Sequence, residues 1–118
     1  IRSVPNIMEV VEVVAAINRS EVLDTSSLEP ASQVKAFRSA TFLIGQHGAG
    51  LTNMIWMSRG SHVIEILPPM PDDAKGIFRA LARTLDLHYT VVPQLSVHAP
   101  VDTEALTAAL EKSERPRN

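Results

Sequence analysis

The chain reads TFLIGQHGAGLTN from Thr41 to Asn53, and this stretch indicates an α/β architecture. Its beginning, Thr41 to Gly45, is a short continuous apolar run of the kind found in strands that are buried on both faces of a parallel sheet. A loop at 46–50 follows, and the apolar residues after it predict a short helix: Leu51, Met54, Ile55 and Met57. A strand that passes through a loop into a helix is the repeating unit of α/β proteins.

Strands and helices also alternate on both sides of this unit. We predict strands at 21–23, 63–67 and 88–92, and helices at 7–18, up to Ser39, at 77–85 and at 102–111. Asp72 or Asp73 is expected to cap the helix at 77–85, and Gly60 to end the helix after the glycine loop in a left-handed conformation. Because parallel strands joined by helices require right-handed crossovers, the sequence predicts a three-layer, Rossmann-like α/β domain with a mainly parallel sheet.

Length and composition fit one globular domain. The chain has 118 residues, of which 45% are hydrophobic and 20% charged, and domains commonly contain about 100 to 150 residues. We assign the domain to 1–112 and a polar, proline-interrupted tail to 113–118. Because residue 1 is Ile rather than an initiator Met, we expect the chain to be part of a longer protein.

The charge balance and the absence of cysteine exclude several classes of function. With 11 Lys and Arg against 13 Asp and Glu, the formal charge is −2, so the chain lacks the basic excess that nucleic acid or an anionic membrane requires. A chain without cysteine has no disulfide scaffold, thiolate zinc site or cysteine nucleophile. No apolar run reaches the roughly 18 residues of a membrane span.

The glycine loop lies where the carboxyl end of a strand meets a helix, which is where open α/β folds bind ligands. Gly45, Gly48 and Gly50 permit positive φ angles and a close approach of the backbone to a ligand. The backbone N–H groups after them lie at a helix start whose dipole favours an anion: Leu51, Thr52 and Asn53. We therefore expect a phosphate or diphosphate here. The alternative is a tight turn that binds nothing.

Glu65 and His47 are the side chains that could perform chemistry at this loop. Glu65 follows Gly45 by twenty residues, close to the spacing at which a Rossmann domain places the acid that binds ribose hydroxyls. A carboxylate that faces solvent or pairs with an arginine is the alternative. His47 could donate a hydrogen bond to a diphosphate or exchange a proton, since imidazole ordinarily titrates near a pH of about 6.5, and a loop histidine without a role is its alternative.

Other cofactors have weaker support. The glycines are spaced G-x-x-G-x-G rather than G-x-G-x-x-G, and no G-K-[ST] follows them, which argues against NAD and ATP. The histidines are scattered at 47, 62, 88 and 98, with His62 and Glu65 expected on opposite faces of a strand, so we predict no metal site. Three large residues are expected in the core: Met54, Trp56 and Met57.

Several segments occur in the order and spacing of a known family. They are Gln33 to Ala40, Phe42 to Gly45, His47 to Asn53, Gly60 and Val63 to Ile66, with Arg2 to Asn6 upstream and Leu81 to Tyr89 downstream. Over residues 2–92 the chain thereby resembles glycosyltransferase family 61, which contains capsular polysaccharide transferases, plant xylosyltransferases and animal enzymes that add N-acetylglucosamine to proteins. It departs from the family pattern at Ile7, where an acid is common, and at Gln46, where a small residue or proline is common.

The resemblance implies a two-domain GT-B enzyme that inverts the anomeric centre and needs neither a metal nor a cofactor. This chain resembles its C-terminal half, which binds a nucleotide sugar such as a UDP-sugar and faces an N-terminal domain. His47 to Asn53 would surround the diphosphate and the sugar, with Gly45 at the base of the loop; Glu65 would contact the nucleoside, and Arg2 would neutralise phosphate charge. The catalytic base would lie in the N-terminal domain or between the domains, with His47 as a secondary candidate.

The resulting interpretation is the donor-binding domain of an inverting glycosyltransferase that transfers a sugar to a glycan or protein hydroxyl, in polysaccharide biosynthesis. On its own the chain is expected to be inactive, because such a site forms between two domains. A bacterial member would be cytoplasmic, and a eukaryotic one would lie in the lumen of the secretory pathway. The alternative function is a nucleotide-binding or interaction module with an α/β fold and no catalysis.

Overall fold

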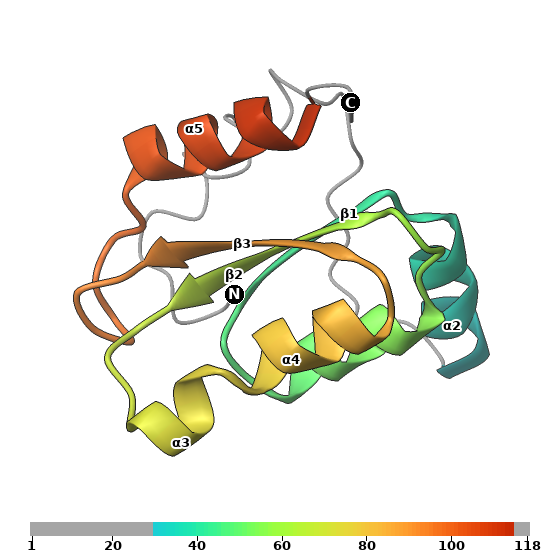
Figure 1. The fold of residues 1–118 in the computed structure, drawn as a ribbon, viewed down its shortest axis with the longest axis horizontal. Coiled ribbons are helices and arrows are strands. Elements are labelled where there is room, and N and C mark those ends of the chain that lie inside the picture. The colour runs from blue at the N-terminus through green and yellow to red at the C-terminus, as the bar shows by residue number, and fades with distance from the viewer. Residues whose placement is uncertain (1–29, 115–118) are drawn as a thin grey trace.

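A three-stranded parallel sheet forms the centre of the structure, a computed structural model that describes residues 30–114 (Figure 1). Its strands are β1 (Phe42–Gln46), β2 (His62–Leu67) and β3 (His88–Pro93), and they lie side by side in the order β1-β2-β3. These are the strands predicted around 41–45, 63–67 and 88–92. The helix predicted at 7–18, the strand at 21–23 and the candidate ligand Arg2 lie outside the described residues.

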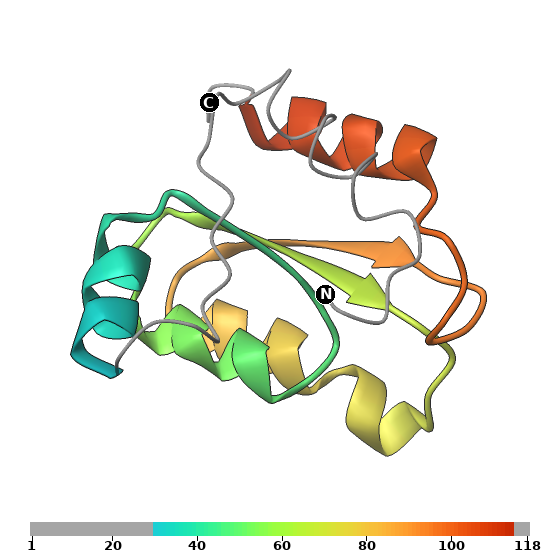
Figure 2. The same ribbon diagram turned by 180° about the vertical axis from the view of Figure 1, so that it is seen from behind.

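Helices cover both faces of this sheet, which confirms the predicted α/β layers. The 3₁₀ helix η2 (Ala49–Trp56) and α4 (Ile77–Thr84) lie on one face, with α2 (Pro30–Ser39) beside η2. The opposite face is covered by α5 (Thr103–Glu114), and the view from behind shows the same arrangement (Figure 2). Successive strands that neighbour one another, with both connecting helices on one face, are the arrangement that right-handed crossovers produce.

Two apolar clusters fill the spaces between the layers, because alternate residues of β2 point to opposite faces. Val63 packs under η2 and α4 with Leu51, Met54, Phe78 and Ala82. On the other face, the cluster under α5 consists of Ile64, Ile66, Val92, Val101, Leu106, Ala109 and Leu110. Burial on both faces explains the nearly continuous apolar sequence of β2, which only Glu65 interrupts.

Aspartate precedes the apolar part of two helices, but its side chain caps only one of them. Asp102 caps α5, since its Oδ1 accepts the backbone N–H groups of Glu104 and Ala105, both at 3.1 Å. The cap predicted from Asp72 or Asp73 is wrong: a separate short helix, α3 (Asp72–Lys75), begins after Pro71 without a side-chain cap. Asp72 bonds instead to Lys75 at 2.8 Å, and this bond and the lysine charge lower the pKa of its carboxyl.

Two further predictions are corrected in detail. The last helix extends to Glu114 rather than ending at 111, since the first proline after it is Pro116. Trp56 is 38% exposed and does not belong to the core, unlike Met54 and Met57. Within residues 30–114, no helix is long and apolar enough to cross a membrane.

Gly60 has the predicted left-handed conformation, with φ of 84°. It lies in the turn between η2 and β2, where its N–H donates to the carbonyl oxygen of Asp86 at 2.9 Å. A side chain at this position would meet no atom within 4 Å, so the φ angle alone disfavours other residues. This glycine therefore fixes the path of the chain into β2.

We expect Gly60→Ala to lower the free energy of unfolding by about 1 to 2 kcal/mol, the usual cost of a left-handed residue with a Cβ. Gly76→Ala is the matched control, because Gly76 has φ of −94° and equally open surroundings. The control should leave stability unchanged or raise it by up to about 1 kcal/mol, through lower entropy of the unfolded chain. Urea unfolding measures both, and equal effects of the two variants would contradict the role of Gly60.

Candidate functional site

Three polar side chains, one from each strand or its end, meet on the sheet face under η2 and α4. Glu65 of β2 is fully buried, and its two carboxylate oxygens have different partners. Oε2 is hydrogen-bonded to Nδ1 of His47, which follows β1 directly. Oε1 accepts a hydrogen bond from the hydroxyl of Tyr89 on β3, at 2.5 Å. We call these residues the His47–Glu65–Tyr89 triad.

The strand register brings the triad together. Gly45 lies opposite Glu65 in the pairing of β1 with β2, and His47, two residues further on, therefore follows on the same face. The backbone N–H of His47 donates to the carbonyl oxygen of Ile66 at 2.9 Å, which prolongs the pairing past the end of β1. The ring edge of Phe78 from α4 contacts the imidazole, with centroids 4.9 Å apart. The imidazole is thus held by both the sheet and the helix above it.

Gly45 is required by close packing rather than by its φ angle. A Cβ at this position would lie 3.1 Å from Cδ2 of Leu51, closer than nearly all real contacts. Leu51 is 2% exposed, and it occupies the space that a side chain at position 45 would fill. Gly45 therefore lets the first turn of η2 approach the sheet beside the triad.

Electrostatics keep the tyrosine of the triad protonated. Burial raises the pKa of the Tyr89 phenol above its ordinary value, and the hydrogen bond and negative charge of Glu65 raise it further, whereas the nearby positive charge of Arg79 lowers it. The phenol is therefore a hydrogen-bond donor at neutral pH and stays one into alkaline solution. A buried carboxylate is costly unless such donors satisfy it, and here the imidazole and the phenol do so.

The carboxylate also selects the tautomer of His47. Because a carboxylate accepts hydrogen bonds only, Nδ1 of His47 carries the proton of the shared bond. The neutral imidazole then has its lone pair on Nε2. The side chain of His47 retains 12% of its surface accessible, whereas that of Glu65 retains none. In this arrangement a ligand can reach His47 but not the fully buried carboxylate of Glu65.

The glycine loop does not use the positive φ angles that the sequence suggested. Gly48 has φ of 163°, which is extended backbone. Among the glycines of residues 30–114, the one with a left-handed φ is Gly60. A Cβ at Gly48 would lie 3.8 Å from the carbonyl oxygen of Gln46, an ordinary contact, and one at Gly50 would meet nothing within 4 Å. The chain itself therefore does not require glycine at 48 or 50, and it leaves space beside both.

The start of η2 is less open to an anion than the sequence suggested. The N–H of Leu51 donates to the carbonyl oxygen of Gly48 at 3.0 Å, so it is not free. Asn53 uses its side-chain amide for a bond to the carbonyl oxygen of Gly50 at 3.1 Å. Ala49 begins this helix and Thr52 is exposed on its first turns. The backbone beside Gly48 and Gly50 is thus more open than the N–H of Leu51 at the helix start.

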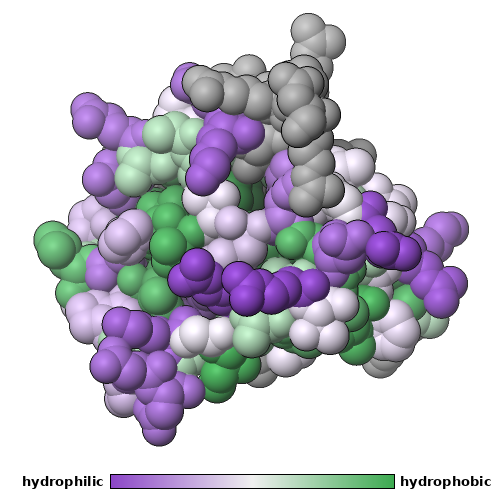
Figure 3. Space-filling view, viewed as in Figure 1, coloured by the Kyte–Doolittle hydropathy of each residue, from purple (hydrophilic) through white to green (hydrophobic). Residues whose placement is uncertain are grey.

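A second polar contact, absent from the predictions, ties the glycine loop to the connection between β3 and α5. Nε2 of Gln46 donates to Oε1 of Gln94 and to the carbonyl oxygen of Val97, both at 2.8 Å. Gln94 is buried and donates to the carbonyl oxygen of Ala99 at 2.6 Å. This connection carries the exposed apolar residues Leu95 and Val97, and Figure 3 shows apolar surface at that left-hand end of the molecule.

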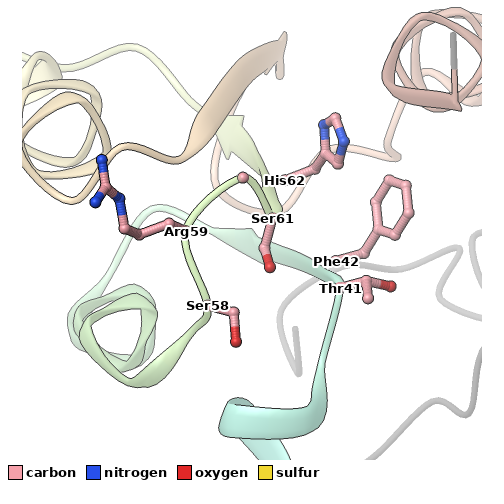
Figure 4. Close-up of a pocket in the computed structure, with 7 residues that line it drawn as sticks. Thr41, Phe42, Ser58, Arg59, Ser61 and His62 are labelled. Carbon is pink, nitrogen blue, oxygen red and sulfur yellow. The ribbon is translucent and has the colours of Figure 1, made fainter. Parts of the chain in front are cut away.

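The opposite, amino edge of the sheet has a different composition. A hollow of about 600 Å³ lies there, lined by Thr41, Phe42, Ser58, Arg59, Gly60, Ser61 and His62 (Figure 4). Arg59 pairs with Asp86 at 2.9 Å rather than lying free. The rings of Phe42, His62 and His88 stack across the three strands, with centroids 5.0 and 4.5 Å apart. Since Phe42 packs under α5, His62 lies on the face opposite Glu65, as predicted.

Residues 30–114 contain no group of three His, Cys, Asp or Glu side chains that could hold a metal ion.

Tyr89 is the site residue that sequence reasoning missed. The alternation of β3 could have assigned it to the face of Glu65, but only the register shows that its hydroxyl reaches the carboxylate.

The raised pKa of Tyr89 predicts a loss of stability in alkaline solution. As the pH rises above 10.0, the ordinary value for tyrosine, the unfolded chain releases the phenol proton while the folded protein retains it, so unfolding becomes more favourable. Urea unfolding at stepped pH measures this loss, and Tyr89→Phe removes this part of it. The chain has one tyrosine, so phenolate absorbance follows Tyr89 alone. A native phenol that titrates at its ordinary pH would contradict the hydrogen bond to Glu65.

Comparison with known proteins was made at the level of families and of single proteins. Among protein-family models, Glycosyltransferase 61 matches residues 1–64, which include β1 and the glycine loop. A search of curated proteins gives no significant match. The family match covers more than half of the 118 residues and agrees with the resemblance in the loop sequence. The chain therefore belongs to glycosyltransferase family 61, a family of enzymes that transfer glycosyl groups.

Proposed function

We propose that this chain is the donor-binding domain of an inverting glycosyltransferase, with His47 as the residue that acts on the reacting groups. The observation that carries the proposal is the pairing of His47 with a fully buried Glu65 beside the open glycine loop. A buried carboxylate that orients an imidazole is the arrangement by which enzymes fix the tautomer and raise the basicity of a catalytic histidine.

The glycine loop supports binding of a nucleoside diphosphate sugar, such as a UDP-sugar. It lies at the carboxyl edge of a parallel sheet, where open α/β folds bind ligands. The space beside Gly48 and Gly50 allows phosphate oxygens to approach the backbone. Near the same site, Arg79 is a positively charged group that can oppose negative charge. The diphosphate is the leaving group, and its growing charge must be stabilised for transfer to proceed.

The reaction we propose is a single displacement. The acceptor hydroxyl oxygen forms a bond to the anomeric carbon, while the bond from that carbon to the diphosphate oxygen breaks and its electron pair leaves with the diphosphate. The proton of the acceptor hydroxyl passes to Nε2 of His47, whose Nδ1–H remains bonded to Glu65. The charge that develops on the imidazole is then balanced by the buried carboxylate.

The sequence resemblance supports the remaining parts of this proposal. They are a GT-B arrangement with a second domain facing the carboxyl edge, independence of metal ions and a glycan or protein hydroxyl as acceptor, in polysaccharide biosynthesis. Exposed apolar side chains at that edge, Leu95 and Val97, are compatible with a facing domain. A facing domain would exclude water and position the acceptor, so we expect the chain alone to bind donor without transferring it.

Nucleotide binding is tested by titrating the labelled chain with UDP and other nucleoside diphosphates at millimolar concentration. We expect backbone amide shifts within 45–53. Gly48→Ala should weaken binding about tenfold or more without loss of stability, because a methyl group fits the free structure but occupies space that we assign to phosphate. Gly76→Ala is the matched control and should bind normally. Shifts spread away from the loop, or normal affinity in Gly48→Ala, would contradict the binding site.

Catalysis is tested by His47→Gln in the full-length protein. Loss of a general base typically lowers the rate by a factor of about 10² to 10⁴. We therefore expect kcat to fall by such a factor, while donor affinity changes little. His98→Gln is the control, since His98 is an exposed histidine on the connection after β3. If His47→Gln transfers sugar at the wild-type rate, the base lies elsewhere. If the wild-type protein binds UDP but transfers no sugar, the chain is a nucleotide-binding module without catalysis.

A further inference from the structure

We propose that Tyr89 is a positioning residue for His47, acting through Glu65: its hydroxyl keeps Glu65 an anion that accepts from Nδ1 of His47, so that Nε2 stays free to accept a proton. The contacts that carry this proposal are the two bonds to the separate oxygens of Glu65. Its consequence for sugar transfer rests on the proposed function of His47, whereas its consequence for the tautomer of His47 does not.

The geometry gives Tyr89 a direct hold on the carboxylate. Tyr89 pairs with Val63 across β2 and β3, and Val91 pairs with Glu65, so the phenol reaches Glu65 diagonally along the same sheet face. Its ring packs at the border of the cluster that contains Phe78, which also contacts His47. Both ends of the tyrosine are therefore fixed: the ring by apolar packing and the hydroxyl by Glu65.

The protonation state of Glu65 decides which nitrogen of His47 can act. As a carboxylate, Glu65 accepts the Nδ1 proton and leaves the lone pair on Nε2. As a neutral acid, it would donate its own proton to Nδ1, and the proton of the neutral imidazole would then lie on Nε2. In that second state Nε2 is a donor and cannot take a proton from an acceptor hydroxyl. The site thus needs an ionised Glu65.

Tyr89 provides half of the hydrogen bonds that make an ionised Glu65 tolerable in the core. A fully buried carboxylate that loses one donor becomes easier to protonate, because burial disfavours the charged form. The positive charge of Arg79 on α4 acts on the phenol of Tyr89. Among the described residues, no Lys or Arg forms an ion pair with Glu65. Without the phenol hydroxyl, His47 would be the remaining partner of Glu65.

Packing alone does not explain a tyrosine at this position. Phenylalanine would fill the same space in the apolar cluster without the cost of partly burying a hydroxyl. The hydroxyl contributes the bond to Glu65, and its raised pKa extends its role as a donor into alkaline solution. Tyr89→Phe therefore removes the proposed function while it preserves the shape.

The experiment compares Tyr89→Phe with Thr107→Val. Thr107 lies on α5, across the sheet, and its hydroxyl donates to the carbonyl oxygen of Thr103 at 2.7 Å, so its replacement also removes one partly buried hydroxyl without touching the triad. Nitrogen chemical shifts of ¹⁵N-labelled histidine report the tautomer of His47 in the protein. In the wild type and in Thr107→Val we expect the Nδ1–H form, and in Tyr89→Phe a several-fold increase of the Nε2–H form at neutral pH.

Kinetics of the full-length protein provide the second readout. In Tyr89→Phe we expect kcat to fall on the order of tenfold at neutral pH, the rate equivalent of one lost charge-assisted hydrogen bond, with the KM for the donor unchanged. The deficit of Tyr89→Phe should be smaller at higher pH, whereas Thr107→Val should follow the wild-type pH profile.

Two results distinguish failure of the role proposed for Tyr89 from failure of the proposed enzymatic function. If Tyr89→Phe only melts at a lower temperature, with the Nδ1–H form and the pH profile of the wild type, Tyr89 is a structural residue and the proposal is wrong. If the wild-type protein transfers no sugar but Tyr89→Phe still shifts His47 toward Nε2–H, the proposed enzymatic function fails while the role of Tyr89 stands.

Discussion

The carboxylate of Glu65 is fully buried in the middle of the central strand, and much of the surrounding structure serves to satisfy it. Its partners come from both neighbouring strands, His47 after β1 and Tyr89 on β3. A slip of either pairing by one residue would turn these side chains to the face under α5 and leave a buried charge without donors. The triad therefore constrains the register of all three strands as strongly as the apolar clusters do.

This constraint is poorly explained by stability alone. A buried polar network is often no more stable than apolar residues of the same volume, and position 65 has apolar neighbours in sequence on both sides, Ile64 and Ile66. What the carboxylate adds is a fixed imidazole whose outward nitrogen can accept a proton. Gly45 contributes to the same region, because its missing side chain lets Leu51 approach the sheet. The local packing thus holds the imidazole of His47 in place.

Much of the fold could be predicted from sequence because its signals are local. The apolar run of β2 and the helix that begins after Asp102 depend only on neighbouring residues, and both occur as predicted. The errors have the same origin. An aspartate before an apolar face predicted a cap, but a separate short helix begins there after Pro71. The apolar character of Trp56 predicted a core position, but its side chain is 38% exposed. A local sequence pattern does not show how neighbouring segments pack against it in the folded protein.

The site shows this limit most clearly. His47 and Gly45 belong to the segment that matches the family, which ends at residue 64, whereas Glu65 and Tyr89 follow it. The spacing of Glu65 from the glycine loop suggested a ribose ligand, but a spacing along the chain does not say whether a side chain faces solvent. Pairing of Gly45 with Glu65 and of Val63 with Tyr89 converts these separate residues into one hydrogen-bonded array. The position and the hydrogen bonding of the histidine are therefore specified by strand register, which exists only once the sheet has formed.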